Sequence, residues 1–482
     1  MRQDHPALER RSVKRIALTE SAVTPGELHR EWQVLCEHYL PLTSPGSTWR
    51  HSRSSMIGAP EQGWKLHISA TILTAVSVLK AVAPFFKERE THFKAVTSLD
   101  ELARLNSGLY YGYSQVGKFI TVYPGSETEA QFLAERLHDL TRGLHGPAAP
   151  FDDQFQRPSC ISYRYGSFKS LRIDNADGTT TLALRDPEGN LVPDRRDAVK
   201  PDWVPDLFPD RFTVELGESP LKTTYRVFQA LIQRGKGGVY KAIDFRNNPP
   251  RLCLIKEGRL HGETTWDGRD GRSRVESEER VLGHLRASGV EVPVVYDSFE
   301  VEKNYYLVTE FIEGVTLNAI LSGRKRRFAS PQILNYYARL AELLSRIHAA
   351  GWAWRDVKPT NLIVTKTGGL RPLDFEGACL IRKPDSDRWG TPGYIPPEWH
   401  DTPRQSSPEA QDLYALGAIG YLLITGVLPT ISATTPIESL RKNIDPILLD
   451  VTRSLLDPEP RKRPSAATVA TMLIQTSASC ET

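Results

Sequence analysis

The chain has 482 residues, of which 40% are hydrophobic and 25% are charged, and its formal net charge at pH 7 is +3. These are values of folded globular domains, and so small a charge on this length excludes an obligate nucleic-acid partner. The segment from Met1 to Arg15 is polar, and the most apolar stretch, residues 413–427, is short and interrupted by glycines. We therefore expect a cytoplasmic protein with neither a signal peptide nor a membrane span.

The chain contains five cysteines, which are odd in number and lack the spacing of a metal site. Reduced thiols in a cytoplasm are the simplest account of such cysteines. The chain is long enough for about three domains of ordinary size.

Five segments follow one another in the expected organisation. Residues 1–60 predict a helical extension, with a helical run at 27–39 that leads into a connection rich in Ser, Arg, Gly and Pro. Residues 61–185 predict an α+β domain, and residues 186–210 are dense in Pro, Asp and Arg, which is typical of a packed linker. The remaining chain predicts a two-lobed domain, with a small lobe at 211–313 and a large lobe at 314–482.

A strand in the α+β segment carries two basic groups on one face. Residues 63–69 alternate apolar and polar side chains, so Lys65 and His67 point the same way while their neighbours face a core. Taken alone, this pattern fits an ordinary strand with a solvated polar face. Three more basic residues, Lys94, Lys118 and Arg164, stand next to other strand-like segments.

The second half contains an ordered set of polar residues that suits phosphoryl transfer. Asp356, Lys358 and Asn361 lie within residues 354–361, and Asp374 follows thirteen residues after Asn361. One carboxylate can orient a substrate hydroxyl, while an amide oxygen and a second carboxylate can hold a divalent metal on nucleotide phosphates. This set in this order predicts a eukaryotic-type Ser/Thr protein kinase.

Charged landmarks of a kinase small lobe precede that set. Lys256 lies on a predicted strand and would contact nucleotide phosphates, and Glu278, in the helical run 274–282, is its expected ion-pair partner. Glu279 is the neighbouring alternative. The segment that leads to the large lobe predicts the adenine-contacting hinge, with Glu310 and Ile312 as nucleotide contacts.

The phosphate-covering loop departs from the usual kinase pattern. Gly235, Gly237 and Gly238 are the expected nucleotide-binding glycines, but only Gly237 falls on one of the three usual positions. Glycines at this density still let backbone N–H groups approach a phosphate. A second departure is Glu376, which follows Asp374 by two residues where most kinases carry glycine. Neither change removes a catalytic charge.

The first half resembles the lyase domain of class III and class IV lanthipeptide synthetases, which is itself related to bacterial phosphothreonine lyases. The second half resembles the kinase domain of the same synthetases. The segments that carry the resemblance are residues 62–67, 117–124 and 163–166 in the first half, and residues 237–240, 256–257 and 374–376 in the second.

The resemblance implies a two-step dehydration of peptide Ser and Thr. The kinase would use ATP or GTP and Mg²⁺ to phosphorylate a hydroxyl, and the lyase would remove the phosphate by β-elimination to give dehydroalanine or dehydrobutyrine. Among the residues that match, Lys94 would be the base, His67 the acid, and Lys65 would stabilise the enolate-like oxygen. The implied phosphate-binding residues are Lys118, Arg164 and, as a helper, Arg157.

The resemblance also implies the partners. The substrate would be a precursor peptide with a leader and a Ser/Thr-containing core, and neither a nucleic acid nor a membrane is expected. Full-length synthetases add a C-terminal cyclase, but the sequence stops at Thr482 and no histidine follows His400. We therefore expect a dehydratase that leaves cyclisation to a separate protein or lacks it, and a homo-oligomer stays open.

Three alternatives follow from the same residues. A signalling Ser/Thr kinase whose N-terminal domain only binds phosphopeptides would leave a stable phosphorylated product. A small-molecule phosphotransferase is disfavoured by Lys358 and residues 390–393, which are typical of kinases that accept a peptide hydroxyl. An inactive kinase joined to an active lyase is disfavoured by the complete phosphoryl-transfer set. The basic run at residues 324–327 predicts no specific role.

Overall fold

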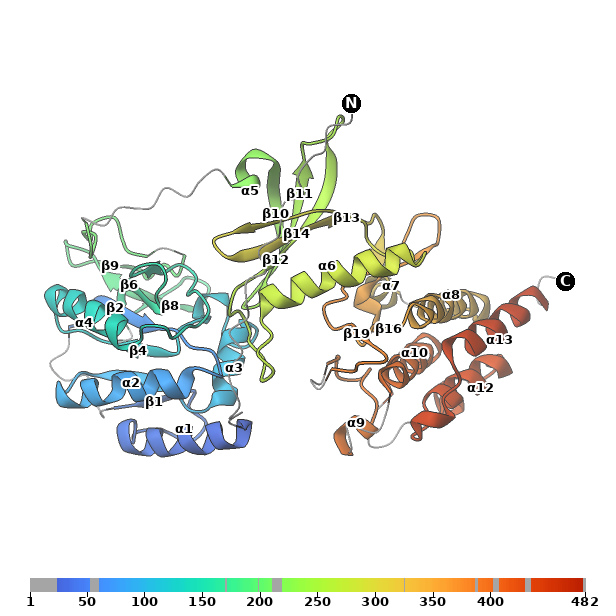
Figure 1. Cartoon of the computed structure of the whole chain (residues 1–482), viewed down its shortest axis with the longest axis horizontal. Helices are drawn as coiled ribbons and strands as arrows, with labels where there is room; N and C mark the ends of the chain where they lie inside the picture. The colour runs from blue at the N-terminus through green and yellow to red at the C-terminus, as the bar shows by residue number, and fades with distance from the viewer. Residues whose placement is uncertain are drawn as a thin grey trace, which may run out of the picture.

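The computed structural model describes residues 24–52, 60–169, 171–197, 199–209, 219–324, 326–385, 389–401, 407–429 and 435–479. An α+β domain precedes a two-lobed domain, as the sequence predicts (Figure 1). No helix within these ranges combines the length and the apolar character that crossing a membrane requires.

The first domain is built on a six-stranded antiparallel sheet with the order β1-β3-β4-β2-β6-β5. Its strands are β1 (Trp49–His51), β2 (Gln62–Ile68), β3 (Phe93–Val96), β4 (Ile120–Val122), β5 (Asp153–Gln154) and β6 (Ile161–Ser167). Leu66 and Ile68 of β2 are fully buried in the core, so Lys65 and His67, which alternate with them, face the other side of the sheet.

Four helices within the described residues pack on this sheet. They are α1 (Pro25–Tyr39), α2 (Ala75–Glu88), α3 (Leu99–Ser107) and α4 (Glu127–Leu140), with a 3₁₀ turn η1 (Tyr113–Gln115). One of them, α1, lies in the segment 1–60 that the sequence predicted as a separate helical extension. Trp32 and Cys36 of α1 belong to the same hydrophobic cluster as Leu66, and Thr24 and Glu27 cap the helix start. Figure 1 shows α1 beside α2, so α1 is part of the first domain rather than a body of its own.

A small sheet spans the boundary expected at residue 185. It contains β7 (Arg172–Asp174), β8 (Thr180–Arg185) and β9 (Leu191–Pro193) in that order. Downstream, Val204 and Leu207 are buried in the core of the first domain. The Pro-rich segment therefore packs against the first domain and carries a strand that the sequence pattern did not predict.

The small lobe of the second domain is a five-stranded antiparallel sheet with one long helix. The sheet order is β10-β11-β12-β14-β13. The elements are α5 (Pro220–Thr223), β10 (Tyr225–Arg234), β11 (Gly237–Asp244), β12 (Arg251–Gly258), α6 (Gly271–Ala287), β13 (Val295–Val301) and β14 (Asn304–Glu310).

The large lobe is mainly helical. Its helices are α7 (Leu317–Ser322), α8 (Ser330–Ala349), α9 (Glu398–Asp401), α10 (Pro408–Thr425), α11 (Ile437–Leu440), α12 (Pro446–Leu455) and α13 (Ala466–Ser479). The large lobe also contains short strands and 3₁₀ turns: β15 (Val315–Thr316), β16 (Trp352–Ala353), η2 (Pro359–Asn361), β17 (Leu362–Val364), β18 (Leu370–Pro372), β19 (Cys379–Leu380) and η3 (Pro460–Lys462). Arg463 anchors this lobe through two hydrogen bonds to Glu398, at 2.7 and 2.8 Å.

The first domain docks on the small lobe through the turn between β10 and β11. The backbone N–H of Gly235 donates to the carbonyl of Ser107 at 3.0 Å, at the end of α3. A Cβ atom at Gly235 would lie 1.6 Å from the carbonyl oxygen of Asn106, so only glycine fits this approach. Arg259 adds a cation–π contact at 4.7 Å from the ring of Tyr113. Figure 1 shows α3 close to the start of α6.

We expect Gly235→Ala to loosen this docking, because the added methyl group overlaps backbone atoms that cannot rotate away. Overpacking of this kind costs about 1–3 kcal/mol. Hydrogen exchange of peptides covering residues 99–118 should become faster. Gly283→Ala is the matched control, because a Cβ there meets nothing within 4 Å. Equal exchange in the Gly235→Ala variant and the wild-type protein would contradict the assignment.

Candidate active sites

The kinase loop holds the carboxylate of Asp356 in a fixed position. Thr391 Oγ1 donates to Asp356 Oδ1 at 2.8 Å, and Lys358 Nζ donates to Asp356 Oδ2 at 2.7 Å. Asn361 Nδ2 donates to the carbonyl oxygen and to Oδ2 of the same aspartate, both at 3.0 Å. A carboxylate held in position in this way can orient a substrate hydroxyl for attack on a phosphate.

A buried aspartate from α10 supports this loop from behind. Asp412 accepts hydrogen bonds from the backbone N–H groups of Trp354 at 2.8 Å and Arg355 at 2.7 Å. His348 Nε2 donates to the same carboxylate at 2.9 Å. These bonds hold Arg355 at a φ of 67°, a strained value for a residue with a side chain. The positive φ turns the chain immediately before Asp356.

The ion pair of the small lobe forms with Glu278. Lys256 Nζ lies 2.5 Å from Glu278 Oε1 and 3.5 Å from Asp374 Oδ1. Glu278 Oε1 also accepts the backbone N–H of Phe375 at 3.0 Å. The alternative, Glu279, instead accepts hydrogen bonds from side chains of β13 and β14. Burial lowers the pKa of Lys256, but Asp374 and Glu278 outweigh it and raise that pKa.

Asp374 is the carboxylate suited to a metal. Burial raises its pKa, but the positive charges of Lys256 and Lys236 outweigh that effect and lower the pKa of Asp374 to about 2. It is therefore ionised at any physiological pH. Together with the amide oxygen of Asn361, its carboxylate supplies the hard oxygen donors that Mg²⁺ prefers. These residues fit the ion that a kinase uses.

The glycine loop is a tight hairpin rather than a wide flap. Arg234 pairs with Gly237, so Gly235 and Lys236 form the two-residue turn. The N–H of Gly235 is used in docking the first domain, as described above. Lys236, to which the sequence pattern gave no role, reaches across the cleft and bonds the carboxylate of Glu376. The two departures from the usual kinase pattern therefore contact each other.

The predicted hinge residues lie at the end of β14 and just after it, where the chain passes from the small lobe to the large lobe. The carboxylate of Glu310 accepts hydrogen bonds from Arg371 at 3.0 Å and from the backbone of Val294 at 3.2 Å, while Ile312 is buried. In the basic run, Arg327 donates to the carbonyl of Leu440 within the large lobe. Position 325 lies outside the described residues.

The basic residues of the first domain gather on one face of its sheet. We use the name basic cluster for Lys65, His67, Lys94, Lys118 and Arg164. Register partners across six strands form one row: His51, Lys94, Thr121, His67, Ser162 and Gln154. Lys65 and Arg164 are partners in the next row on the same face. Because partners in register project to the same side, strands distant in sequence bring these groups together.

A buried aspartate that the sequence pattern missed joins two members of the basic cluster. Asp152 Oδ2 lies 2.5 Å from His67 Nδ1, and Asp152 Oδ1 lies 2.9 Å from Lys118 Nζ. Burial raises its pKa, but His67 and Lys118 outweigh that effect and lower the pKa of Asp152 to about 2. Asp152 therefore stays ionised and fixes the orientation of both basic groups.

Burial makes the amines of the basic cluster unusually easy to deprotonate. It lowers the pKa of Lys94 to about 8, helped by the positive charge of Arg196, and the pKa of Lys65 to about 7 despite Asp194. Lys94 also lies over the ring of Trp49, with Nζ 4.2 Å from its centroid. A lysine with such a pKa can act as a base near neutrality, which an exposed lysine cannot.

The pKa of His67 is also lowered by burial, to about 4, although Asp152 opposes the shift. The imidazole is therefore neutral in the free protein at pH 7. An anion bound beside it would raise this pKa, because an opposite charge favours the protonated form.

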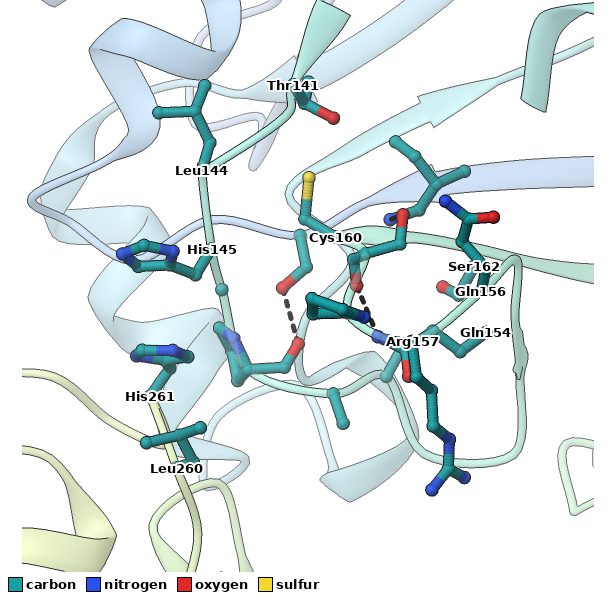
Figure 2. Close-up of a pocket in the computed structure, with 18 of the residues that line it drawn as sticks. Thr141, Leu144, His145, Gln154, Gln156, Arg157, Cys160, Ser162, Leu260 and His261 are labelled. Atoms are coloured by element: carbon teal, nitrogen blue, oxygen red, sulfur yellow. Dashed lines mark hydrogen bonds between the residues drawn. The ribbon is translucent and has the colours of Figure 1, made fainter. Parts of the chain in front are cut away.

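The other expected phosphate-binding residues lie in different places. Arg164 belongs to the basic cluster and donates to Asp194 Oδ1 at 2.9 Å. Arg157 instead pairs with Glu302 of the small lobe at 2.9 Å, so the structure does not bring it to the basic cluster. It lines a cavity of about 850 Å³ that both domains border. Figure 2 shows Arg157 extending away from Cys160, and the stacked rings of His145 and His261 facing each other.

The lowered lysine pKa values carry a stability cost that depends on pH. An unfolded lysine keeps its proton up to about pH 10.4, whereas Lys65 and Lys94 release theirs near pH 7 to 8. Between these folded-state pKa values and about pH 10.4, the unfolded state binds more protons than the folded state. The free energy of unfolding therefore rises with pH across this range. We expect the melting temperature of Lys94→Met to exceed that of the wild-type protein at pH 7, and the difference to shrink by pH 9. A constant difference would contradict the buried, ionisable placement.

Comparisons with known proteins match a family model to each half of the chain. The family model described as the N-terminal domain of RamC matches residues 42–216, and the protein kinase domain model matches residues 229–474. A probable SapB synthase of Streptomyces coelicolor is 31% identical over 390 residues, which are 78% of this chain and 41% of that protein. The serine/threonine-protein kinase PknA of Mycobacterium tuberculosis is 32% identical over 221 residues, which are 43% of this chain and 48% of that protein.

The chain thus spans less than half the length of each of these two relatives. The two family models follow each other in the order that the sequence motifs predict. The chain therefore belongs to the protein kinase family and carries its kinase domain behind a RamC-type N-terminal domain, which confirms the predicted resemblance to class III lanthipeptide synthetases.

Proposed function

We propose that this chain dehydrates Ser and Thr residues of a ribosomally made precursor peptide in the cytoplasm, first by phosphorylation and then by elimination of the phosphate. The observation that carries the proposal is the basic cluster: two partly buried lysines with lowered pKa lie beside three further basic groups, on a chain that also holds a complete phosphoryl-transfer set. A domain that merely bound a phosphopeptide would need cations but no amine that loses its proton near neutrality.

In the kinase step, Asp356 orients the peptide hydroxyl, and Lys256, held by Glu278, contacts the nucleotide phosphates. Asn361 and Asp374 would hold Mg²⁺, which neutralises charge on the phosphates of ATP or GTP. Lys358 lies between Asp356 and Thr391, where it can stabilise the negative charge at the transferred group.

In the lyase step, neutral Lys94 removes the Cα proton of the phosphorylated residue. The electron pair moves to form the Cα–Cβ double bond as the Cβ–O bond to phosphate breaks. Lys65, whose amine keeps N–H donors whether or not it is protonated, stabilises by hydrogen bonding the negative charge that develops on the adjacent carbonyl oxygen. His67 gives a proton to the departing phosphate. The substrate phosphate itself prepares this acid, because its negative charge raises the pKa of the buried imidazole.

The direct test supplies the intermediate and omits the kinase step. A synthetic phosphoserine peptide is incubated with the protein without nucleotide, and mass spectrometry follows the loss of phosphoric acid. Elimination to dehydroalanine supports the lyase. Binding of the intact phosphopeptide without any product would support the rival, a signalling kinase with a phosphopeptide-binding domain.

A further inference from the structure

The loop that follows β9 lies over one edge of the basic cluster. Arg164 donates from one guanidinium nitrogen to Asp194 Oδ1 and to the carbonyl of Arg195, both at 2.9 Å. The backbone N–H of Tyr165 donates to the carbonyl of Val199 at 2.8 Å. The loop is therefore fixed at both ends to β6, next to Arg164.

The two arginines at the centre of this loop differ in their surroundings. Arg195 pairs with Asp197 at 2.9 and 3.1 Å, and its side chain is 71% exposed. The positive charge of Arg196, by contrast, acts on Lys65, Lys94 and Lys118 and lowers the pKa of each. Arg196 directly follows Arg195, whose carbonyl oxygen is bonded to Arg164 of the basic cluster, and Arg196 is exposed, so it lies at the solvent edge of the cluster.

The cations of the basic cluster are partly compensated before any substrate arrives. Asp152 neutralises Lys118, and Asp194 neutralises Arg164. Arg196 is exposed to solvent, and among the described residues no carboxylate forms an ion pair with it. A permanent cation in this position repels the neighbouring lysines. A bound phosphate dianion would attract both Arg196 and those lysines.

We propose that Arg196 is a substrate-binding residue of the lyase site, which grips the phosphate of a phosphoserine or phosphothreonine peptide from the solvent side. This inference rests on the proposed function. The guanidinium suits the role, because it forms two parallel hydrogen bonds to phosphate oxygens and never loses its charge. Arg196 would close the side of the phosphate that Lys118 and Arg164 leave open.

The neighbouring arginine provides a matched control. With a synthetic phosphoserine peptide and no nucleotide, Arg196→Ala should raise Kd and KM about tenfold to a hundredfold, the range for losing hydrogen bonds between charged groups. We expect kcat to change less. Arg195→Ala removes the same side chain from the outer face and should behave like the wild-type protein, and Arg196→Lys should recover part of the affinity.

A second readout separates a direct role from a structural one. The groups that face Lys94 are His51 on β1, Lys65 on β2 and Arg196 on the loop, beside the ring of Trp49. The Arg196→Ala variant changes only one of these groups and removes a positive charge that lowers the pKa of Lys94. The limb of the pH–rate profile that Lys94 sets near pH 8 should therefore move to higher pH. The limb should not move in Arg195→Ala.

Two results decide the inference. Equal Kd values for the two alanine variants, with an unmoved limb, would overturn it. If the wild-type protein binds the phosphopeptide without eliminating phosphate, the proposed function fails, and the ratio of Kd values still decides the role of Arg196.

Discussion

Replacing Lys94 by methionine is expected to stop the chain's reaction halfway, with phosphorylated peptide accumulating and no dehydrated product. Removal of a general base lowers a rate by about 10²–10⁴. Lys94 contacts no residue of the kinase site, so phosphorylation should continue at its original rate. Intact-mass spectra of a substrate peptide after incubation with Mg²⁺ and nucleotide measure both steps together.

The control for this variant is Lys80→Met. Lys80 is 51% exposed and pairs with Glu31 on the surface, so its loss should change neither step. The Lys94→Met protein should also melt about 2–4 °C higher at pH 7, since a buried charge worth about 1 kcal/mol is removed. Normal dehydration by a well-folded Lys94→Met protein would contradict the assignment of the base.

The Asp356→Asn variant should block the phosphorylation step and leave the elimination step intact. The amide keeps the shape of the side chain but loses the charge that orients the hydroxyl, so phosphoryl transfer should fall by about 10²–10⁴. Elimination from a peptide that is already phosphorylated should be unaffected. The measurement compares the two reactions on matched serine and phosphoserine peptides.

Mixing the two variants extends this test. If the phosphorylated peptide leaves one protein molecule and enters another, Lys94→Met and Asp356→Asn together should restore dehydration. Loss of elimination in Asp356→Asn alone would contradict separate sites, because it would place Asp356 in both reactions.

Motifs that are local in sequence predicted the kinase domain, which the family model confirms. Asp356, Asn361 and Asp374 lie within twenty residues, so their order alone indicates the chemistry. The choice between Glu278 and Glu279 needed the structure, because one helical residue turns the side chain by about 100°. Spacing alone could not say which of the two faces Lys256.

The basic cluster was predicted only in part, because a sheet joins distant strands. Alternation placed Lys65 and His67 on one face, but Asp152 and Asp194 lie in irregular segments with no periodic signal. Their pairing with His67 and Arg164 depends on the strand order. Arg157 looked equivalent to the other basic residues in sequence, yet its side chain pairs with the small lobe.

Contacts between the domains were also outside the reach of sequence patterns. Gly235 looked like a phosphate-binding glycine, and the structure uses its N–H to dock α3. The helical run at the start of the chain predicted α1 correctly, but only the shared core with Leu66 assigns it to the first domain. Both results depend on packing between segments far apart in sequence.

The central claim is that one chain turns a peptide hydroxyl into an alkene through a phosphate, and a deuterium label tests it most directly. A candidate serine peptide deuterated at Cα is incubated with the protein, Mg²⁺ and nucleotide, and intact masses are followed over time. The account predicts a transient phosphorylated peptide that keeps deuterium, followed by a product that has lost both phosphate and deuterium. A phosphorylated peptide that persists, or a return to deuterated serine by hydrolysis, would contradict it.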